Sequence, residues 1–188
     1  METRPGKSKS AERGKETLFR VTYNHQSKLV QIADYKANII ITVSTMVISA
    51  IVAISTYGSI SGSMLEGGLR MIIPVGIIIL SSLIALVFAV QAAKPKLIRN
   101  PENGQTGRKS SLLFFGVIAS YSQPEYLEKM KNMLDAGEEM YEHMTIDIYN
   151  QGLVLKRKYN LLVYAYQTLM YGFVISVLLF LGLMFAGL

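Results

Sequence analysis

The sequence predicts an all-α integral membrane protein with three transmembrane helices and a helical cytoplasmic module formed by extensions of the spans. Three apolar stretches, at residues 39–57, 71–93 and 161–188, match or exceed the roughly 20 residues that an α-helix needs to cross a bilayer. Hydrophobic residues make up 51% of the chain and charged residues only 17%, and the two kinds are segregated along it. No segment shows the alternation of apolar and polar residues that is typical of a half-buried strand.

The amino-terminal part of the chain is polar and basic. Residues 1–15 are rich in Lys, Arg, Ser and Gly and predict a disordered basic tail. Residues 16–38 predict a cytoplasmic helix, because one stripe of side chains recurs at steps of three and four. The stripe consists of Leu18, Val21, His25, Leu29 and Ile32. No apolar segment lies near the start of the chain, so we expect no cleavable signal peptide.

The first span, residues 39–57, is unusually rich in hydroxyl groups. They belong to Thr42, Ser44, Thr45, Ser49, Ser55 and Thr56. Small and hydroxyl-bearing side chains favour contacts between helices inside a bilayer, where burial of apolar surface no longer drives association. The same hydroxyl groups can instead bond back to carbonyl groups of their own helix. The sequence is compatible with both interpretations.

Glycines and prolines mark the connections between the spans. Residues 58–70 contain four glycines and predict a periplasmic loop. In the second span, residues 71–93, Pro74 falls in the first turn, where its missing N–H costs little. Two prolines and two glycines between residues 94 and 111 predict another loop.

Residues 94–160 predict a cytoplasmic helical region. The apolar run Leu112–Tyr121 is about ten residues long and too short to span a bilayer, so it is buried in this region or lies against the membrane surface. Ser122 and Glu125 have the spacing of a capping box, which predicts that a helix begins there. A further helix runs from about Glu138 directly into the third span, residues 161–188.

The distribution of Lys and Arg predicts the orientation in the membrane. Eight of the 19 precede the first span, one lies in the following loop, and ten lie between the second and third spans. By the positive-inside rule, the N-terminus and residues 94–160 are cytoplasmic and the C-terminus is periplasmic. The net charge of +6 gathers near membrane ends, which favours lipid headgroups over nucleic acid as its partner.

The chain offers little for catalysis or for metal binding. It has no cysteine, and its two histidines are His25 and His143. The His-Glu-x-x-His and Glu-x-x-His patterns of metal sites are missing, and so are the serine elbow and the glycine-rich phosphate loops. We therefore predict no catalytic residue, no metal and no cofactor, and expect that the protein is not an enzyme.

A polar cluster before the first span is the first candidate site. Asp34, Lys36 and Asn38 occupy the last turns of the cytoplasmic helix. Lys36 and Asn38 lie where the helix meets lipid headgroups, and snorkelling is enough to explain them. Alternatively, Asp34 and Lys36 belong to a cytoplasmic bundle and face polar residues within 150–158. There they would pair with the other helix or receive an anionic ligand.

Two further candidates come from the central region. Phe114 and Phe115 either pack in the core of a small domain or form an aromatic wall on which a base stacks. Arg157 stands in the run Lys156-Arg157-Lys158, which is explained as a topology signal. Its guanidinium group is also suited to a phosphate.

Several motifs together resemble the membrane-effector family of the Pycsar antiphage systems. They are ADYKAN at 33–38, Lys94-Pro95-Lys96 after the second span, LLFFG at 112–116, and the helix through 147–158 that leads into the last span. The resemblance covers nearly the whole chain, from about Phe19 to Leu188, and its best motifs are ADYKAN and LLFFG.

The resemblance implies a bacterial inner-membrane effector. In such systems a pyrimidine cyclase answers phage infection by making cyclic CMP or cyclic UMP, and the effector then compromises the membrane. The infected cell dies before phage is released. The resemblance thus implies a cyclic pyrimidine nucleotide as the activating ligand and the lipid bilayer as a partner. The candidate ligand-binding residues are Asp34, Lys36, Asn38, Phe114, Phe115 and Arg157.

Two functions remain open at this level. A ligand-gated effector requires a homo-oligomer, because three uncharged spans alone provide no polar lining for an ion. Ser and Thr from the first span would then face inward. The alternative is a membrane scaffold that docks a soluble partner protein through its cytoplasmic helices. That function explains the same amphipathic stripes without a ligand site.

Overall fold

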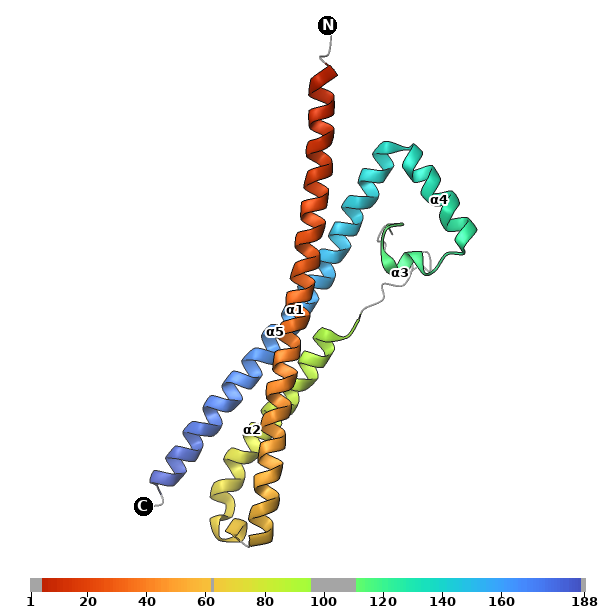
Figure 1. Cartoon of the computed structure of the whole chain (residues 1–188). Helices are drawn as coiled ribbons and strands as arrows, with labels where there is room; N and C mark the ends of the chain where they lie inside the picture. Colours follow the sequence, from red (N-terminus) through yellow and green to blue (C-terminus); the bar gives the residue numbers. More distant parts are fainter. Residues whose placement is uncertain (1–4, 62, 96–110, 187–188) are drawn as a thin grey trace. The chain divides into compact units, whose positions relative to one another are not determined.

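The computed structural model describes residues 5–61, 63–95 and 111–186, and these ranges contain helices and no strand. The prediction of an all-α protein is therefore confirmed. The helices, in chain order, are α1 (Pro5–Ser61), α2 (Ser63–Ala93), α3 (Phe115–Ile118), α4 (Gln123–Asp135) and α5 (Gly137–Phe185) (Figure 1).

Three of the helices, α1, α2 and α5, each contain a stretch that is long and apolar enough to cross a membrane. This agrees with the predicted number of spans. α1 has 57 residues and α5 has 49. A span needs only about 20. Each of these two helices therefore has a long portion outside its apolar stretch.

The start of the chain differs from the expected disordered tail. α1 already begins at Pro5, so most of residues 1–15 are helical, while residues 1–4 lie outside the described part. Proline is favoured in the first turn of a helix. Good helix formers such as Ala11 and Glu12 follow it, and their propensity outweighs that of the two glycines, Gly6 and Gly14, in this part of the helix.

The connection between the first two spans also differs from expectation. α1 continues to Ser61 and α2 begins at Ser63, so the expected loop at residues 58–70 is largely helical. Met64, Leu65 and Glu66 are good helix formers and offset the glycines around them. The loop expected at 94–111 lies mostly outside the described residues.

The chain divides into two compact units, and α1 and α5 contribute to both. One unit comprises residues 1–30 and 95–156, and we call it the polar unit. The other comprises residues 31–94 and 157–188 and contains all three apolar stretches. We call it the membrane unit.

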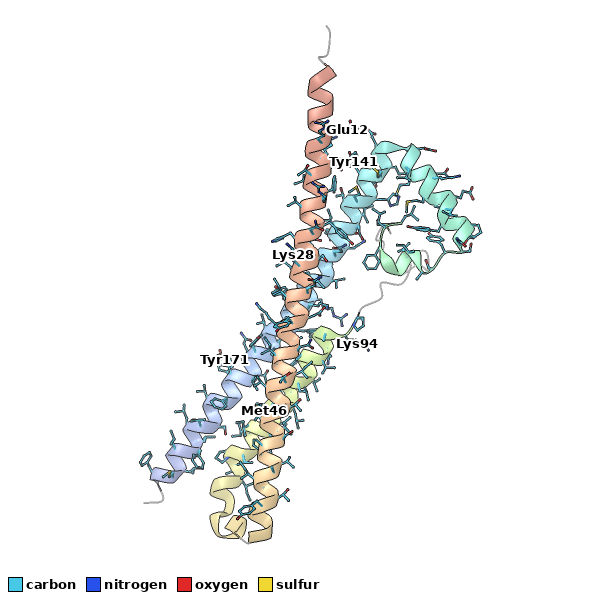
Figure 2. All side chains as sticks on the ribbon, in the orientation of Figure 1. Glu12, Lys28, Met46, Lys94, Tyr141 and Tyr171 are labelled. Atoms are coloured by element: carbon cyan, nitrogen blue, oxygen red, sulfur yellow. The ribbon has the colours of Figure 1, made fainter. Side chains whose placement is uncertain are left out.

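Mostly small side chains, with Ile40 and Leu162, form the buried core of the membrane unit. The buried positions include Ala33, Ala37, Ile40 and Ser44 on α1, Ser82, Ala85, Ala89 and Ala92 on α2, and Leu162, Ala165 and Ser176 on α5. Small residues let helix backbones approach closely, which favours association where lipid tails are as apolar as the protein. Large apolar side chains such as Met46 and Tyr171 are exposed (Figure 2), as expected of a surface that contacts acyl chains.

Helices α2 and α5 make a close contact at Gly172. A β-carbon at this position would lie 2.1 Å from both Cβ and Oγ of Ser81, far inside van der Waals contact. One turn further along α5, the Ser176 hydroxyl donates a hydrogen bond of 2.7 Å to the Pro74 carbonyl. A glycine and a serine on α5 therefore fix its register against α2.

Some hydroxyl groups of the first span bond within their own helix, and one is buried between helices. Thr42, Thr45 and Thr56 each donate to the carbonyl oxygen four residues earlier, at 2.9, 2.8 and 2.8 Å. These threonines therefore bond within their own helix. Ser44 differs, because it is buried in the core of the unit and its Oγ has no hydrogen-bond partner among the described residues.

In the polar unit, the predicted start of α4 is confirmed. The Ser122 N–H and hydroxyl both donate to Oε2 of Glu125, at 3.1 and 2.7 Å, and Pro124 lies in the first turn. This is the expected capping box. The helix ends at Asp135, and α5 begins two residues later at Gly137.

The short apolar run Leu112–Tyr121 forms a turn followed by α3. Val117 is buried in the polar unit, and Met133 of α4 is buried in the same unit. Ile118 is exposed. Only part of the run is therefore buried, because a helix of four residues can direct only one of its faces inward.

Candidate functional site

An ion pair joins two helices of the membrane unit just before their apolar stretches. The Lys158 ammonium of α5 donates a hydrogen bond to Oδ1 of Asp34 on α1. The Lys158 side chain is only 11% exposed, and that of Asp34 is 41% exposed. A buried ammonium is costly unless it is paired, so the Asp34 carboxylate is what allows Lys158 to lie there.

A second cation lies beside this pair. The Lys36 ammonium lies 5.8 Å from the ring centroid of Tyr159, which immediately follows Lys158. An ammonium at this distance is attracted by the negative face of an aromatic ring. Asp34 and Lys36 are therefore both engaged with α5, as the bundle interpretation predicts. Whether they also bind a ligand stays a prediction.

The other predicted residues belong to both units of the chain. Asn38 is exposed, and its backbone carbonyl accepts the hydroxyl of Thr42 at 2.9 Å. Arg157 is exposed as well. Phe114 is half-buried in the turn before α3, and Phe115 begins α3. These two phenylalanines belong to the polar unit, whereas Asp34, Lys36, Asn38 and Arg157 belong to the membrane unit.

The polar unit contains a cavity of ≈ 420 Å³ that the sequence analysis did not predict. It is bordered by α1, by α5 and by the turn before α3, and we call it the α1–α5 pocket. Its lining residues are Glu16, Phe19, Arg20, Tyr23, Asn24, Leu113, Met144, Asp147 and Ile148. Ligand pockets typically enclose about 300–1,000 Å³ and combine apolar walls with a few polar groups.

Asp147 is the most unusual residue of this pocket. It is only 4% exposed, and its Oδ2 accepts a hydrogen bond of 2.9 Å from the Gln151 amide. Its Oδ1 is buried and has no hydrogen-bond partner among the described residues. Burial raises the pKa of the Asp147 carboxyl group, and the bond from Gln151 opposes part of that shift. A buried acceptor without a partner costs about 1–3 kcal/mol.

Aromatic contacts hold α1 against α5 at the edge of the pocket. The rings of Phe19 and Tyr141 lie 5.5 Å apart, inclined at 30°. The Lys15 ammonium lies 5.5 Å from the Tyr141 ring centroid. Tyr141 and Glu12 also border a neighbouring cavity of ≈ 360 Å³ (Figure 2). These contacts fix the separation of the two helices from which most of the α1–α5 pocket is built.

The sequence does contain a signal for this pocket. Asp147 and Ile148 follow Met144 by three and four residues, so an acidic side chain shares a helix face with apolar ones. An acid inside an apolar stripe is unusual, because charged groups are rarely buried without a partner. The pairing of that face with Phe19 and Tyr23 depends on contacts between distant parts of the chain.

The described residues contain no group of three or more His, Asp or Glu side chains that could hold a metal ion.

Comparison with known proteins gives one result. A family model described as the Pycsar effector protein domain matches residues 17–186. The match includes the apolar stretches of α1, α2 and α5 and the residues that line the α1–α5 pocket, except Glu16. No curated protein and no solved structure matches the chain.

Proposed function

The chain belongs to the Pycsar effector protein family, and we propose that it acts as a membrane effector activated by cyclic CMP or cyclic UMP. On activation the protein oligomerises and impairs the bacterial inner membrane, so that the infected cell dies before phage is released. The family is one of non-enzymatic effectors. The activating nucleotide is then a signal that the protein binds, and not a substrate that it converts.

The observation that carries this proposal is the extent of the family match. It covers residues 17–186, which include the apolar stretches and most of the polar unit. A protein of this kind requires one part that receives a signal and one part that acts on the lipid. A polar unit with a cavity and a membrane unit with three apolar helices fit these two requirements.

The membrane unit supports an oligomeric mechanism of damage. Alanine and serine side chains fill its core, and no charged side chain lies within the apolar stretches. A single copy therefore offers an ion no hydrated path, because conduction needs a polar lining. Several copies would place a new surface between subunits, where hydroxyl groups of the first span face a shared opening.

The energy required of the ligand is moderate. Moving a two-state assembly from 1:99 to 99:1 needs a preference of about 5.5 kcal/mol for the active state. An oligomer that binds one nucleotide per subunit divides this requirement among its sites. No single site then needs a large difference in affinity between the two states.

The test is to express the protein in bacteria together with an active pyrimidine cyclase and to follow the membrane potential with a voltage-sensitive dye. We expect depolarisation and loss of viability with the active cyclase, and neither with a catalytically inactive one. Crosslinking should show larger assemblies under the same condition. Depolarisation that is equal with both cyclases would overturn nucleotide gating. A stoichiometric soluble partner together with no conductance in liposomes would favour the scaffold function instead.

A further inference from the structure

We propose that the α1–α5 pocket binds a planar heteroaromatic ring that carries an N–H donor on one side and an anionic group on the other. This inference rests on the proposed function, in which the ligand is a cyclic pyrimidine nucleotide. Such a nucleotide has all three features: the base, the hydrogen-bond donors on its edge, and one charged cyclic phosphate. The pocket provides a matching group for each.

The walls of the pocket suit a flat ring. Phe19 and Tyr23 are four residues apart and therefore lie on the same face of α1. Leu113, Met144 and Ile148 form the apolar side of the pocket. Aromatic side chains provide surfaces on which a nucleobase stacks, whatever its identity. Tyr23 is 48% exposed, so its ring remains available to a ligand.

Asp147 provides the acceptor for the edge of the base. Asp147 lines the cavity, and its Oδ1 is buried and lacks a hydrogen-bond partner among the described residues. Cytosine presents an amino group at C4 and uracil presents an N3–H, and a carboxylate oxygen accepts a hydrogen bond from either. The ligand would thus supply the donor that the folded protein lacks at this atom.

Arg20 and Asn24 provide donors for the phosphate. With Glu16 they follow one another at intervals of four residues on α1, so the three side chains form a row along one face. The guanidinium of Arg20 is the positive charge among the lining residues, and it suits a phosphate. The carboxylates of Glu16 and Asp147 repel an anion, so the phosphate is directed towards Arg20. Glu16 can instead accept a hydrogen bond from the ribose hydroxyl.

A ligand in this pocket contacts the two helices that also build the membrane unit. Arg20 and Tyr23 come from α1, and Asp147 and Ile148 come from α5. Both helices continue into the apolar stretches. The bound nucleotide would therefore contact α1 and α5, two helices whose later portions belong to the membrane unit.

The test is titration calorimetry on the full-length protein in detergent, with cyclic CMP and cyclic UMP as probes. We expect the Arg20→Ala variant to bind the preferred nucleotide about tenfold or more weakly, because a charge-assisted hydrogen bond is lost. Lys28→Ala is the matched control. Lys28 is an exposed cation on the same helix and is not among the lining residues (Figure 2), so its loss should leave affinity within about twofold.

The free nucleosides separate the role of Arg20 from a general effect on the fold. Cytidine and uridine lack the phosphate, so we expect weak binding that Arg20→Ala does not weaken further. For Asp147, the leucine variant removes the acceptor and should lose about tenfold or more in affinity. The asparagine variant keeps an acceptor oxygen and should remain closer to the unchanged protein. Circular dichroism of each variant checks that the helices are intact.

The outcomes distinguish the two proposals. If the unchanged protein binds a cyclic pyrimidine nucleotide and the Arg20 and Asp147 variants bind it equally well, the ligand lies elsewhere. The assignment of the pocket is then wrong, and the proposed function stands. If the unchanged protein binds neither nucleotide, the proposed function itself is overturned, together with this assignment.

Discussion

Lys158 of α5 and Asp34 of α1 form a hydrogen-bonded ion pair across 124 positions of the chain. Each residue lies a few positions before the apolar stretch of its own helix. The lysine side chain is largely buried while the carboxylate is partly exposed. The Asp34 carboxylate therefore neutralises the buried Lys158 ammonium at the point where both helices begin their apolar stretches.

Removing the carboxylate should destabilise the protein more than removing both charges. We expect Asp34→Asn to cost about 1–3 kcal/mol, which is less than for a fully buried pair because the Asp34 side chain is 41% exposed. Adding Lys158→Met should restore part of the loss, since no unpaired cation is then buried. Thermal unfolding in detergent measures the three variants as a double-mutant cycle. Strictly additive losses would show that the two side chains are not coupled.

Lys36 allows a functional test of the neighbouring contact. We expect Lys36→Ala to insert normally but to lose toxicity and depolarisation, because the ammonium over the Tyr159 ring is removed. Lys36→Arg keeps a cation that can stack on the same ring and should retain activity. Membrane fractionation and a voltage-sensitive dye provide the two readouts. Full activity of the alanine variant would leave Lys36 with only a snorkelling role.

Gly172 should tolerate no side chain. An added β-carbon would lie 2.1 Å from Cβ of Ser81, so Gly172→Ala must push α5 away from α2. We expect a loss of about 1–3 kcal/mol, as for other overpacked contacts. Gly182→Ala on the same helix is the control, because an added β-carbon there meets nothing within 4 Å. Equal melting temperatures for the two variants would contradict the close contact.

The start of α4 should loosen in acid. Hydrogen bonds from the Ser122 hydroxyl and N–H lower the pKa of Glu125 below its usual value of 4.5. A carboxyl group with a lowered pKa stabilises the folded state above its unfolded pKa, and the effect is lost as the pH falls through the folded pKa. Hydrogen-exchange protection of the first turn of α4 should therefore decrease below about pH 4.5. In Glu125→Gln this pH dependence should be absent, and its persistence would assign it to another group.

The orientation can be tested with introduced cysteines, because the chain has none of its own. The positive-inside rule places Glu138 in the cytoplasm and Ala186 in the periplasm. A membrane-impermeant maleimide should label Ala186→Cys in intact cells with a permeabilised outer membrane. It should label Glu138→Cys only after the inner membrane is disrupted. The reverse pattern would show that the topology is inverted.

The sequence predicted the helical class, the number of spans and the capped start of α4, because these depend on local pattern and length. Of the two interpretations that the sequence left open for the cluster before the first span, one paired Asp34 with polar residues in the segment 150–158, where Lys158 lies. It did not identify Lys158 as the partner, because small residues such as Ala37 and Ala165 are buried on both helices, and their spacing alone leaves several alignments possible.

Periodicity alone does not predict which segments pair to form the α1–α5 pocket. The spacing of Met144, Asp147 and Ile148 places an acid on an apolar helix face, but it does not indicate that Phe19 lies opposite. Their proximity arises only when distant segments pack together. The loop expected at 58–70 is largely helical for a different reason: Met64, Leu65 and Glu66 favour a helix, and their propensity offsets that of the glycines.

The outward-facing side chains of the membrane unit have a consequence for how copies meet. Residues such as Met46, Ile54 and Phe185 are exposed, and leaving a bilayer would transfer their apolar surface into water, so the protein stays in the membrane after insertion. The protein then diffuses only within the bilayer. Its local concentration there far exceeds what the same number of copies would reach in the volume of the cell. Side-to-side contacts too weak to hold a dimer in solution can therefore be enough to gather subunits.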